Sequence, residues 1–214
     1  YYQSFNWATR IVKENALQYR DKPAAVVLDI DETVLNNSPS TGFQILENKP
    51  FSDELWDSWC RLAEAEPLPG VLEFTKMARQ SGVEVFYVSN RKVHLMSVTI
   101  ENLEKYGFPN ADSTHILLKQ DTSSKDARRE IVSRDYEIIL FIGDNLGDFD
   151  GSFDRRTNQI ANKLVHDRYD QFGTKYIILP NPVYGAWEKS FRSDEESPVE
   201  TRRSALKSFL TQNE

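Results

Sequence analysis

Residues 25–37 read AVVLDIDETVLNN, and the rest of the chain is organised around this stretch. The apolar run 24–28 has the length and composition of a buried parallel strand. Asp29 and Asp31 follow it, and they point the same way on an extended chain because residues i and i+2 share a face. Two carboxylates held together repel each other, so either one is protonated or a cation lies between them. The stretch therefore predicts a charged site at a strand's carboxyl end, where open α/β sheets bind ligands.

The composition is that of an ordinary globular protein. Of the 214 residues, 39% are hydrophobic and 28% charged, which is enough for one α/β core with an elaboration. The net charge of −7 and the absence of a Lys/Arg cluster argue against a nucleic-acid polymer or an anionic membrane as partner. No run approaches the roughly 18–20 apolar residues of a transmembrane helix. We also expect a trimmed mature chain, because neither an initiator Met nor a signal peptide is present.

Helical and strand patterns alternate beyond residue 69. This alternation predicts a doubly wound, mostly parallel α/β sheet with right-handed crossovers. The expected helices cover residues 71–79, 93–106, 125–134 and 155–168. The expected strands cover residues 83–88, 115–118, 138–142 and 176–179.

We divide the chain into four parts. Residues 1–23 hold an N-terminal helix (5–20) that packs on the core, 24–35 and 70–190 form the catalytic core, 36–69 form a small helical cap, and 191–214 form a linker and a C-terminal helix (198–210). In the cap, Ser52 is the expected N-cap of a helix that carries Trp56, Trp59 and Cys60 on one stripe.

A second acidic cluster follows the strand at 138–142. Asp144 and Asp148 lie in a loop where Gly143 and Gly147 permit a tight turn. If this strand neighbours the first, four carboxylates converge at one sheet edge. Such oxygen ligands suit Mg²⁺ better than zinc. The alternative is that each acidic loop merely caps a helix, but two clusters after two buried strands favour a metal site.

Residues that suit an anion follow the other two strands. The hydroxyl of Ser89 and the backbone amides around Asn90 can bind a phosphoryl oxygen. Lys125 begins a predicted helix, where the N–H groups and the ammonium both favour an anion. Taken singly, Ser89 is typical of a turn and Lys125 of a solvated surface. Their positions just beyond strand ends favour phosphate binding.

Other polar residues are interpreted as structural. Cys60, the only cysteine, excludes an intrachain disulfide and is expected to be a small core residue. Arg128 and Arg129, like the pair at 202–203, are interpreted as solvated helix faces. The three histidines match no metal-ligand spacing and are expected at surface or packing positions: His94, His115 and His166.

The order DIDET, SNR, a downstream Lys and GDNLGD resembles the four motifs of the haloacid dehalogenase (HAD) superfamily of phosphohydrolases. More narrowly, LDIDETVLNNSP, the KPF and Trp56/Trp59 segment, FYVSNRK, GDNLGDF and LPNPVYGAWE resemble the bacterial class C acid phosphatases, the lipoprotein 5′-nucleotidase group. The similarity covers roughly residues 24–190 and includes motifs outside the acidic clusters. It implies a HAD-like Rossmann-type core with a small cap.

The resemblance also implies roles for the acidic residues. Asp29 would be the nucleophile that forms an aspartyl phosphate, and Asp31 would protonate the leaving alkoxide and then activate water. Mg²⁺ would be held by the Asp29 carboxylate, the Asp31 carbonyl and Asp144, with Asp148 acting directly or through water. The transferring phosphoryl oxygens would be held by Ser89 and Lys125.

For the leaving group, the resemblance implies that Trp56 and Tyr184 stack a nucleotide base, worth about 1–3 kcal/mol per base. A Trp at helical spacing is equally typical of a core. Ser40 and Phe43 stand where relatives often carry Tyr and Trp, so the substrate pocket can differ.

The sequence therefore predicts a Mg²⁺-dependent acid phosphatase that acts on phosphomonoesters such as nucleoside monophosphates. The resemblance implies an extracytoplasmic location, as a periplasmic or outer-membrane lipoprotein, and a homodimer is compatible with apolar residues on the flanking helices. The alternatives are a sugar phosphatase, a phosphotransferase, or a binding or storage protein on the same fold.

Overall fold

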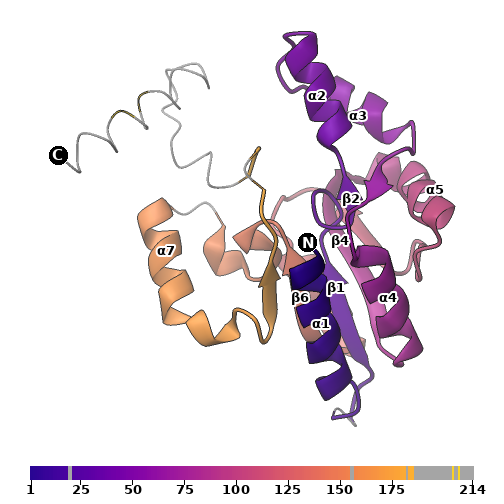
Figure 1. The fold of residues 1–214 in the computed structure, drawn as a ribbon, viewed down its shortest axis with the longest axis vertical. Helices are drawn as coiled ribbons and strands as arrows, with labels where there is room; N and C mark the ends of the chain where they lie inside the picture. Colours follow the sequence, from indigo (N-terminus) through magenta and orange to yellow (C-terminus); the bar gives the residue numbers. More distant parts are fainter. Residues whose placement is uncertain (19–20, 155–156, 182, 186–203, 205–206, 208–214) are drawn as a thin grey trace.

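The computed structural model describes residues 1–18, 21–154, 157–181, 183–185, 204 and 207. Its centre is a five-stranded sheet in the order β5-β4-β1-β6-β7, and every neighbouring pair is parallel (Figure 1). The strands are β1 (Ala24–Leu28), β4 (Glu84–Lys92), β5 (Ile116–Lys119), β6 (Glu137–Gly143) and β7 (Tyr176–Ile178). The predicted parallel α/β sheet is confirmed.

The chain winds outward from β1 in two directions. It passes first to β4 and β5 on one side and later to β6 and β7 on the other. The carboxyl end of β1 thus lies at the switch point of the sheet, the usual ligand position in this class of fold. The register sets Leu28 opposite Tyr87 of β4 and Ile142 of β6, so the residues after these strands gather at one edge.

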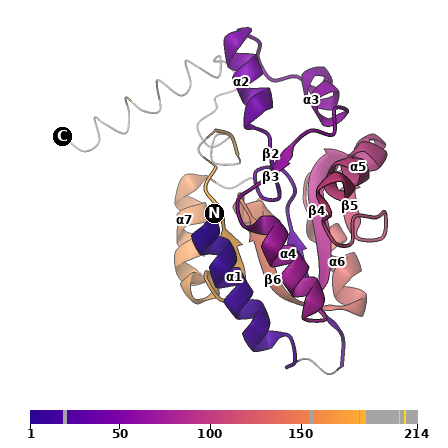
Figure 2. The ribbon, with the colours of Figure 1, turned by 45° about the vertical axis from the view of Figure 1, so that its right-hand side comes forward.

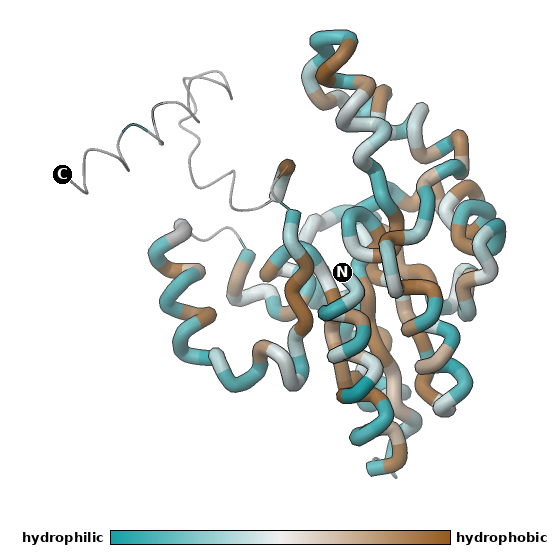
Figure 3. Tube along the Cα trace, viewed as in Figure 1, coloured by the Kyte–Doolittle hydropathy of each residue, from teal (hydrophilic) through white to brown (hydrophobic). Residues whose placement is uncertain are grey.

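Helices cover both faces of the sheet, which explains why all five residues of β1 are apolar and buried. Val26 and Leu28 belong to an apolar core shared with one helical layer, and Ala25 and Val27 to a second core shared with α6. Figure 2 shows the layers, and Figure 3 shows apolar residues concentrated on the strands. The first layer contains α1 (Tyr2–Asn15), α4 (Val71–Gln80) and α5 (Met96–Tyr106), and the second contains α6 (Asp126–Asp135).

The segment between β1 and α4 leaves the sheet and returns. Its two ends pair as short antiparallel strands, and its two helices lie beyond the carboxyl ends of the sheet strands (Figures 1 and 2). The elements are β2 (Leu35–Asn36), α2 (Ser38–Leu46), α3 (Asp53–Cys60) and β3 (Glu66–Pro67). Ser52 caps α3, because its Oγ accepts a hydrogen bond from the Leu55 amide at 3.2 Å. We continue to interpret residues 36–69 as a cap.

Some element boundaries differ from the predicted ones. The N-terminal helix runs from Tyr2 to Asn15, and within the expected helix 155–168 the described residues form α7 (Asn158–Asp167), which Thr157 caps. The 3₁₀ segments are η1 (Val93–Leu95), η2 (Leu146–Asp148), η3 (Gly151–Phe153) and η4 (Tyr169–Gln171). The predicted linker and C-terminal helix lie outside the described residues. In the described part of the chain, no helix has the length and apolarity needed to cross a bilayer.

Candidate active site

Asp29 follows β1 directly and is buried beside a cation. Its amide donates to the Ile142 carbonyl of β6 at 3.0 Å, which fixes its position between the two strands. Lys125, also buried, is the N-cap of α6, and its Nζ contacts Asp29 Oδ1 and lies 2.7 Å from Asp148 Oδ1. Burial raises the pKa of Asp29 well above its usual value, even with the Lys125 ammonium beside it.

Three carboxylates meet at this point. Asp29, Asp144 and Asp148 each offer an oxygen, and these oxygens all lie within 4.8 Å of one another. The turn η2 brings Asp148 back toward the strand end, where its Oδ2 accepts from the Asn145 amide at 2.9 Å. Burial and the neighbouring Asp148 raise the pKa of Asp144 to about 7. A compact set of oxygen donors that repel one another fits a hard divalent cation, which would keep all three ionised.

Gly143 allows this cluster to form. A Cβ at this position would lie 2.3 Å from Asp148 Oδ2 and 2.5 Å from its Cβ. Any side chain would therefore push Asp148 away from the strand end. This glycine is needed for the close approach of a neighbouring side chain.

The side chain of Asp31 has different neighbours. Its Oδ1 lies 2.8 Å from Arg91 Nη2, and Arg91 Nε donates to Oδ1 and Oδ2 at 3.0 and 3.2 Å. Arg91 is only 1% exposed. The Asn37 side-chain amide donates to Oδ1 at 3.0 Å and Ser89 Oγ to Oδ2 at 3.4 Å. The strand ends converge as predicted, but among the described residues the cluster of carboxylates has three members, and the Asp31 side chain is held apart from it.

The structure separates the two candidates that follow β4. Ser89 is fully buried against Asp31, and its Oγ also accepts from the Arg91 amide at 3.0 Å. Asn90 is exposed, and its Oδ1 accepts from Arg128 Nη2 at 2.8 Å. Ser89 and Lys125 thus lie beside Asp31 and Asp29 respectively, whereas the Asn90 side chain is occupied by Arg128.

The prediction that Arg128 and Arg129 form a solvated helix face is wrong, because both are buried. Arg128 contacts the Ser89 carbonyl and donates to the Ser124 carbonyl at 2.9 Å. Arg129 donates to the carbonyls of Gly147 and Asp148 at 2.8 and 2.9 Å. Loop carbonyls at strand ends lack ladder partners, and the multiple donors of a guanidinium satisfy several of them. These two side chains tie the active-site loops together.

Each of the two aromatic candidates lies next to an ionisable side chain. Trp56 is half-buried on α3, and the Arg91 guanidinium lies 5.8 Å from its ring centroid. Tyr184 is 37% exposed, and its hydroxyl donates to Glu32 Oε2. Burial and the Asp31 carboxylate raise the pKa of Glu32 to about 8. Of the two positions where relatives often differ, Ser40 is buried and Phe43 is exposed on α2.

Four residues at the site were not assigned from sequence. All four lie within motifs already quoted, but an isolated carboxylate, amide or guanidinium follows no spacing rule that marks its function. They are Glu32, Asn37, Arg91 and Asn181. The first two lie in LDIDETVLNNSP, the third in SNR and the fourth in LPNPVYGAWE, so these motifs were the available signal.

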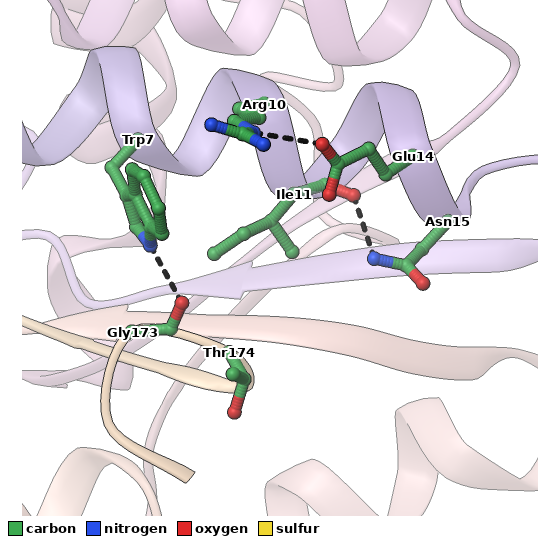
Figure 4. Close-up of a pocket in the computed structure, with 7 residues that line it drawn as sticks. All are labelled: Trp7, Arg10, Ile11, Glu14, Asn15, Gly173 and Thr174. Atoms are coloured by element: carbon green, nitrogen blue, oxygen red, sulfur yellow. Dashed lines mark hydrogen bonds and ion pairs between the residues drawn. The ribbon is translucent and has the colours of Figure 1, made fainter. Parts of the chain in front are cut away.

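A cavity of about 250 Å³ between α1 and the turn before β7 contains none of the predicted site residues (Figure 4). Its polar groups satisfy one another. Trp7 Nε1 donates to the Gly173 carbonyl at 2.6 Å, and Arg10 pairs with Glu14 at 2.7 Å. The carboxylate cluster, not this cavity, is therefore the candidate active site.

A protein-family model, the HAD superfamily, subfamily IIIB (acid phosphatase), matches residues 1–187. The chain belongs to this family. The match confirms the resemblance predicted from the motifs. Among solved structures, the class C acid phosphatase from Bacillus anthracis is similar over 94% of this chain and 86% of its own, with 41% identity and a TM-score of 0.89. That protein has also been solved with tungstate bound.

Two plant proteins are similar to this chain at lower sequence identity. Acid phosphatase 1 from Solanum lycopersicum is 29% identical over 166 residues, which cover 74% of this chain and 57% of that protein. Vegetative storage protein 1 from Arabidopsis thaliana is 26% identical over 148 residues, which cover 65% and 54% respectively. The chain spans 54–59% of the length of the plant relatives it matches.

Proposed function

We propose that this subfamily IIIB chain is an acid phosphatase that hydrolyses phosphomonoesters through a covalent intermediate on Asp29. One observation supports this most directly. Asp29 and Asp31 leave the same strand, but Asp29 lies against Lys125 in a carboxylate cluster whereas Asp31 is held by Arg91. Different environments give two carboxylates different roles, as a two-step phosphoryl transfer requires.

In the first step, an Asp29 oxygen attacks phosphorus and the bond from phosphorus to the leaving oxygen breaks. Asp31 donates its proton to the departing alkoxide, which leaves as an alcohol. In the second step, Asp31 takes a proton from water while the water oxygen attacks phosphorus. The bond from phosphorus to Asp29 then breaks, which releases phosphate and restores both carboxyl groups. Arg91 and Asn37 hold Asp31 for both transfers.

Asp29, Asp144 and Asp148 are the side chains that would hold a divalent cation, together with the Asp31 carbonyl, and we infer that this cation is Mg²⁺. When bound, it supplies positive charge that stabilises the transferring phosphoryl group. Lys125 and Ser89 add donors on the protein side. The tungstate bound by the Bacillus anthracis relative is a phosphate-like oxyanion, which supports an anion site here.

The proposed substrates are nucleoside monophosphates and other small monoesters. Trp56, which is half-buried, and Tyr184, which is exposed, supply accessible aromatic surface, and stacking accepts any base. The family resemblance supports an extracytoplasmic location, in the periplasm or as an outer-membrane lipoprotein. Exposed apolar residues on flanking helix α1, such as Tyr2 and Trp7, are compatible with a homodimer. A sugar phosphatase or phosphotransferase would keep the carboxylate chemistry and differ in the cap.

The test is hydrolysis of a chromogenic aryl phosphate with Mg²⁺ and with EDTA. Asp29→Asn should lower kcat by roughly 10³-fold or more, because a neutral amide replaces the nucleophilic carboxylate. The exposed Asp21→Asn is the matched control and should keep full activity. Acid quenching should trap phosphate on the peptide that contains Asp29. Wild-type rates in Asp29→Asn would contradict the mechanism, and an inactive wild type would favour the storage-protein alternative.

A further inference from the structure

The loop that carries Tyr184 follows β7 and is fastened at two points by side chains without an assigned role. At one point, Asn181 Nδ2 donates to Asp144 Oδ2 at 2.8 Å, while its Oδ1 accepts from the amides of Val183 and Tyr184 at 3.0 and 3.3 Å. A single amide thus connects the carboxylate cluster to the backbone that presents the aromatic ring.

Glu32 makes the second attachment. Its carboxylate accepts from the Tyr184 hydroxyl and from the Asn37 amide and side chain at 2.9 and 3.3 Å. Its φ is +58°, in the left-handed region that a residue with a Cβ rarely occupies. Such strain persists only where the surroundings fix the residue, and it is common at functional sites. Here it aims the side chain that follows Asp31 toward Tyr184.

The two attachments form one hydrogen-bonded chain. It runs from Asp144 through Asn181 to the backbone of Tyr184. From the Tyr184 hydroxyl it continues through Glu32 to Asn37. The side-chain amide of Asn37 then donates to Asp31 Oδ1 at 3.0 Å. Asn37 also accepts from Trp59 Nε1 at 2.7 Å, so the chain reaches cap helix α3. It therefore begins at a proposed metal ligand and ends at the proposed acid/base.

We propose that Glu32 and Asn181 are positioning residues that hold Tyr184 at the leaving-group side of the site and thereby set the preference for phosphomonoesters with an aromatic leaving group over small alkyl ones. This rests on the proposed function for the identity of the site. An aromatic side chain held in place before binding loses less freedom when a base stacks on it. Removing either attachment should weaken binding of nucleotides selectively.

The first test measures hydrogen exchange of peptides that cover residues 181–185, which requires no catalysis. Asn181→Ala and Glu32→Ala should each speed exchange by about 2–10-fold, the range expected for one lost hydrogen bond. Glu32→Gln keeps an acceptor for the Tyr184 hydroxyl and should retain protection. Glu47→Ala, which removes an exposed cap carboxylate, is the control. Unchanged exchange in both alanine variants would overturn the proposal.

The second test measures binding by calorimetry in the Asp29→Asn background, with a nucleoside monophosphate and with glycerol phosphate. Glu32→Ala should lower the affinity ratio of the two ligands by roughly 5–100-fold, the range for one stacked base. It should add nothing once Tyr184→Ala is present, because Glu32 acts through that ring. Glu32→Gln should restore the ratio.

Equal losses for both ligands, additive effects in the double variant, or no nucleotide binding at all would overturn the proposal. These readouts are separate from turnover. A wild-type protein that binds nucleotides with the expected ratio but does not hydrolyse them would contradict the proposed function and leave this positioning role supported.

Discussion

Asp29 and Asp31 lie two residues apart at the end of one strand, and their surroundings differ in almost every respect. Asp29 is buried among two other carboxylates with the Lys125 ammonium against it. Asp31 lies outside that cluster, and its carboxylate accepts hydrogen bonds from the planar guanidinium of Arg91. Asp29 thus lies beside an ammonium group that neutralises it, whereas the orientation of Asp31 is fixed by hydrogen bonds. The comparison shows how one residue type acquires two roles from its neighbours.

The two cations suit these tasks. Lys125 is a compact charge whose donors reach both Asp29 and Asp148, so it neutralises without fixing a plane. Arg91 presents a rigid fork that binds both oxygens of Asp31 and sets the plane of its carboxylate. Substitution of Lys125 should therefore change mainly the stability of the protein, whereas substitution of Arg91 should change mainly the rate of catalysis.

The largest effect is expected for Lys125→Met. It leaves two buried carboxylates without their ion-pair partner, which should lower the free energy of unfolding by about 3–5 kcal/mol at neutral pH without metal. Urea denaturation in EDTA measures this. Lys92→Met is the matched control, since Lys92 pairs with Asp53 at the surface and should matter little. Equal stability of Lys125→Met and wild type would mean that the cluster does not need this ammonium.

Arg91→Lys should come next, because it keeps the positive charge and removes the fork. The loss of one or two charge-assisted hydrogen bonds to Asp31 corresponds to roughly a 10–100-fold fall in kcat/KM for an aryl phosphate. In an Asp31→Asn background the same change should have little further effect. Independent, additive losses would show that Arg91 acts on something other than Asp31.

Much of the scaffold could be predicted from sequence because its signals are local. The uninterrupted apolar run gave β1 its observed bounds, and Ser52 with two acids after it marked the start of α3. Helix α2 was not predicted, because Ser40 is its only buried residue and no apolar stripe marks it.

The site residues that directly follow strands could be predicted from sequence. Those whose role depends on a partner far away in the sequence could not. The acids were found because each follows an apolar strand. Arg91 meets Asp31 across 60 residues, and no spacing encodes that contact. Arg128 was interpreted as solvated because a run of two charges on a helix is typical of a face in water. Its burial depends on loop carbonyls that exist only in the folded chain.

Gly143→Ala should affect the surroundings of Asp29 and leave those of Asp31 unchanged. The added Cβ would displace Asp148 from the cluster, and we expect Mg²⁺ affinity measured by calorimetry to fall by at least about 10–100-fold, because the loss of a residue that only supports a metal ligand already has an effect of this size. Gly42→Ala is the control, since nothing lies within 4 Å of a Cβ there. Unchanged Mg²⁺ affinity in Gly143→Ala would remove Asp148 from the metal site.

The smallest effect concerns the Asp31 side, where α3 closes over the site. Cys60 at the end of α3 is 2% exposed, and burial raises the pKa of its thiol to about 12 although Arg91 opposes the shift. Because the reactive thiolate is then scarce at pH 8, iodoacetamide should leave Cys60 unmodified in the native protein and modify it fully in urea, as read by mass spectrometry. Rapid labelling of the native protein would mean that α3 moves away from the core readily. The orientation of Asp31 would then depend on its hydrogen bonds to Arg91 and Asn37 and not on packing of the cap.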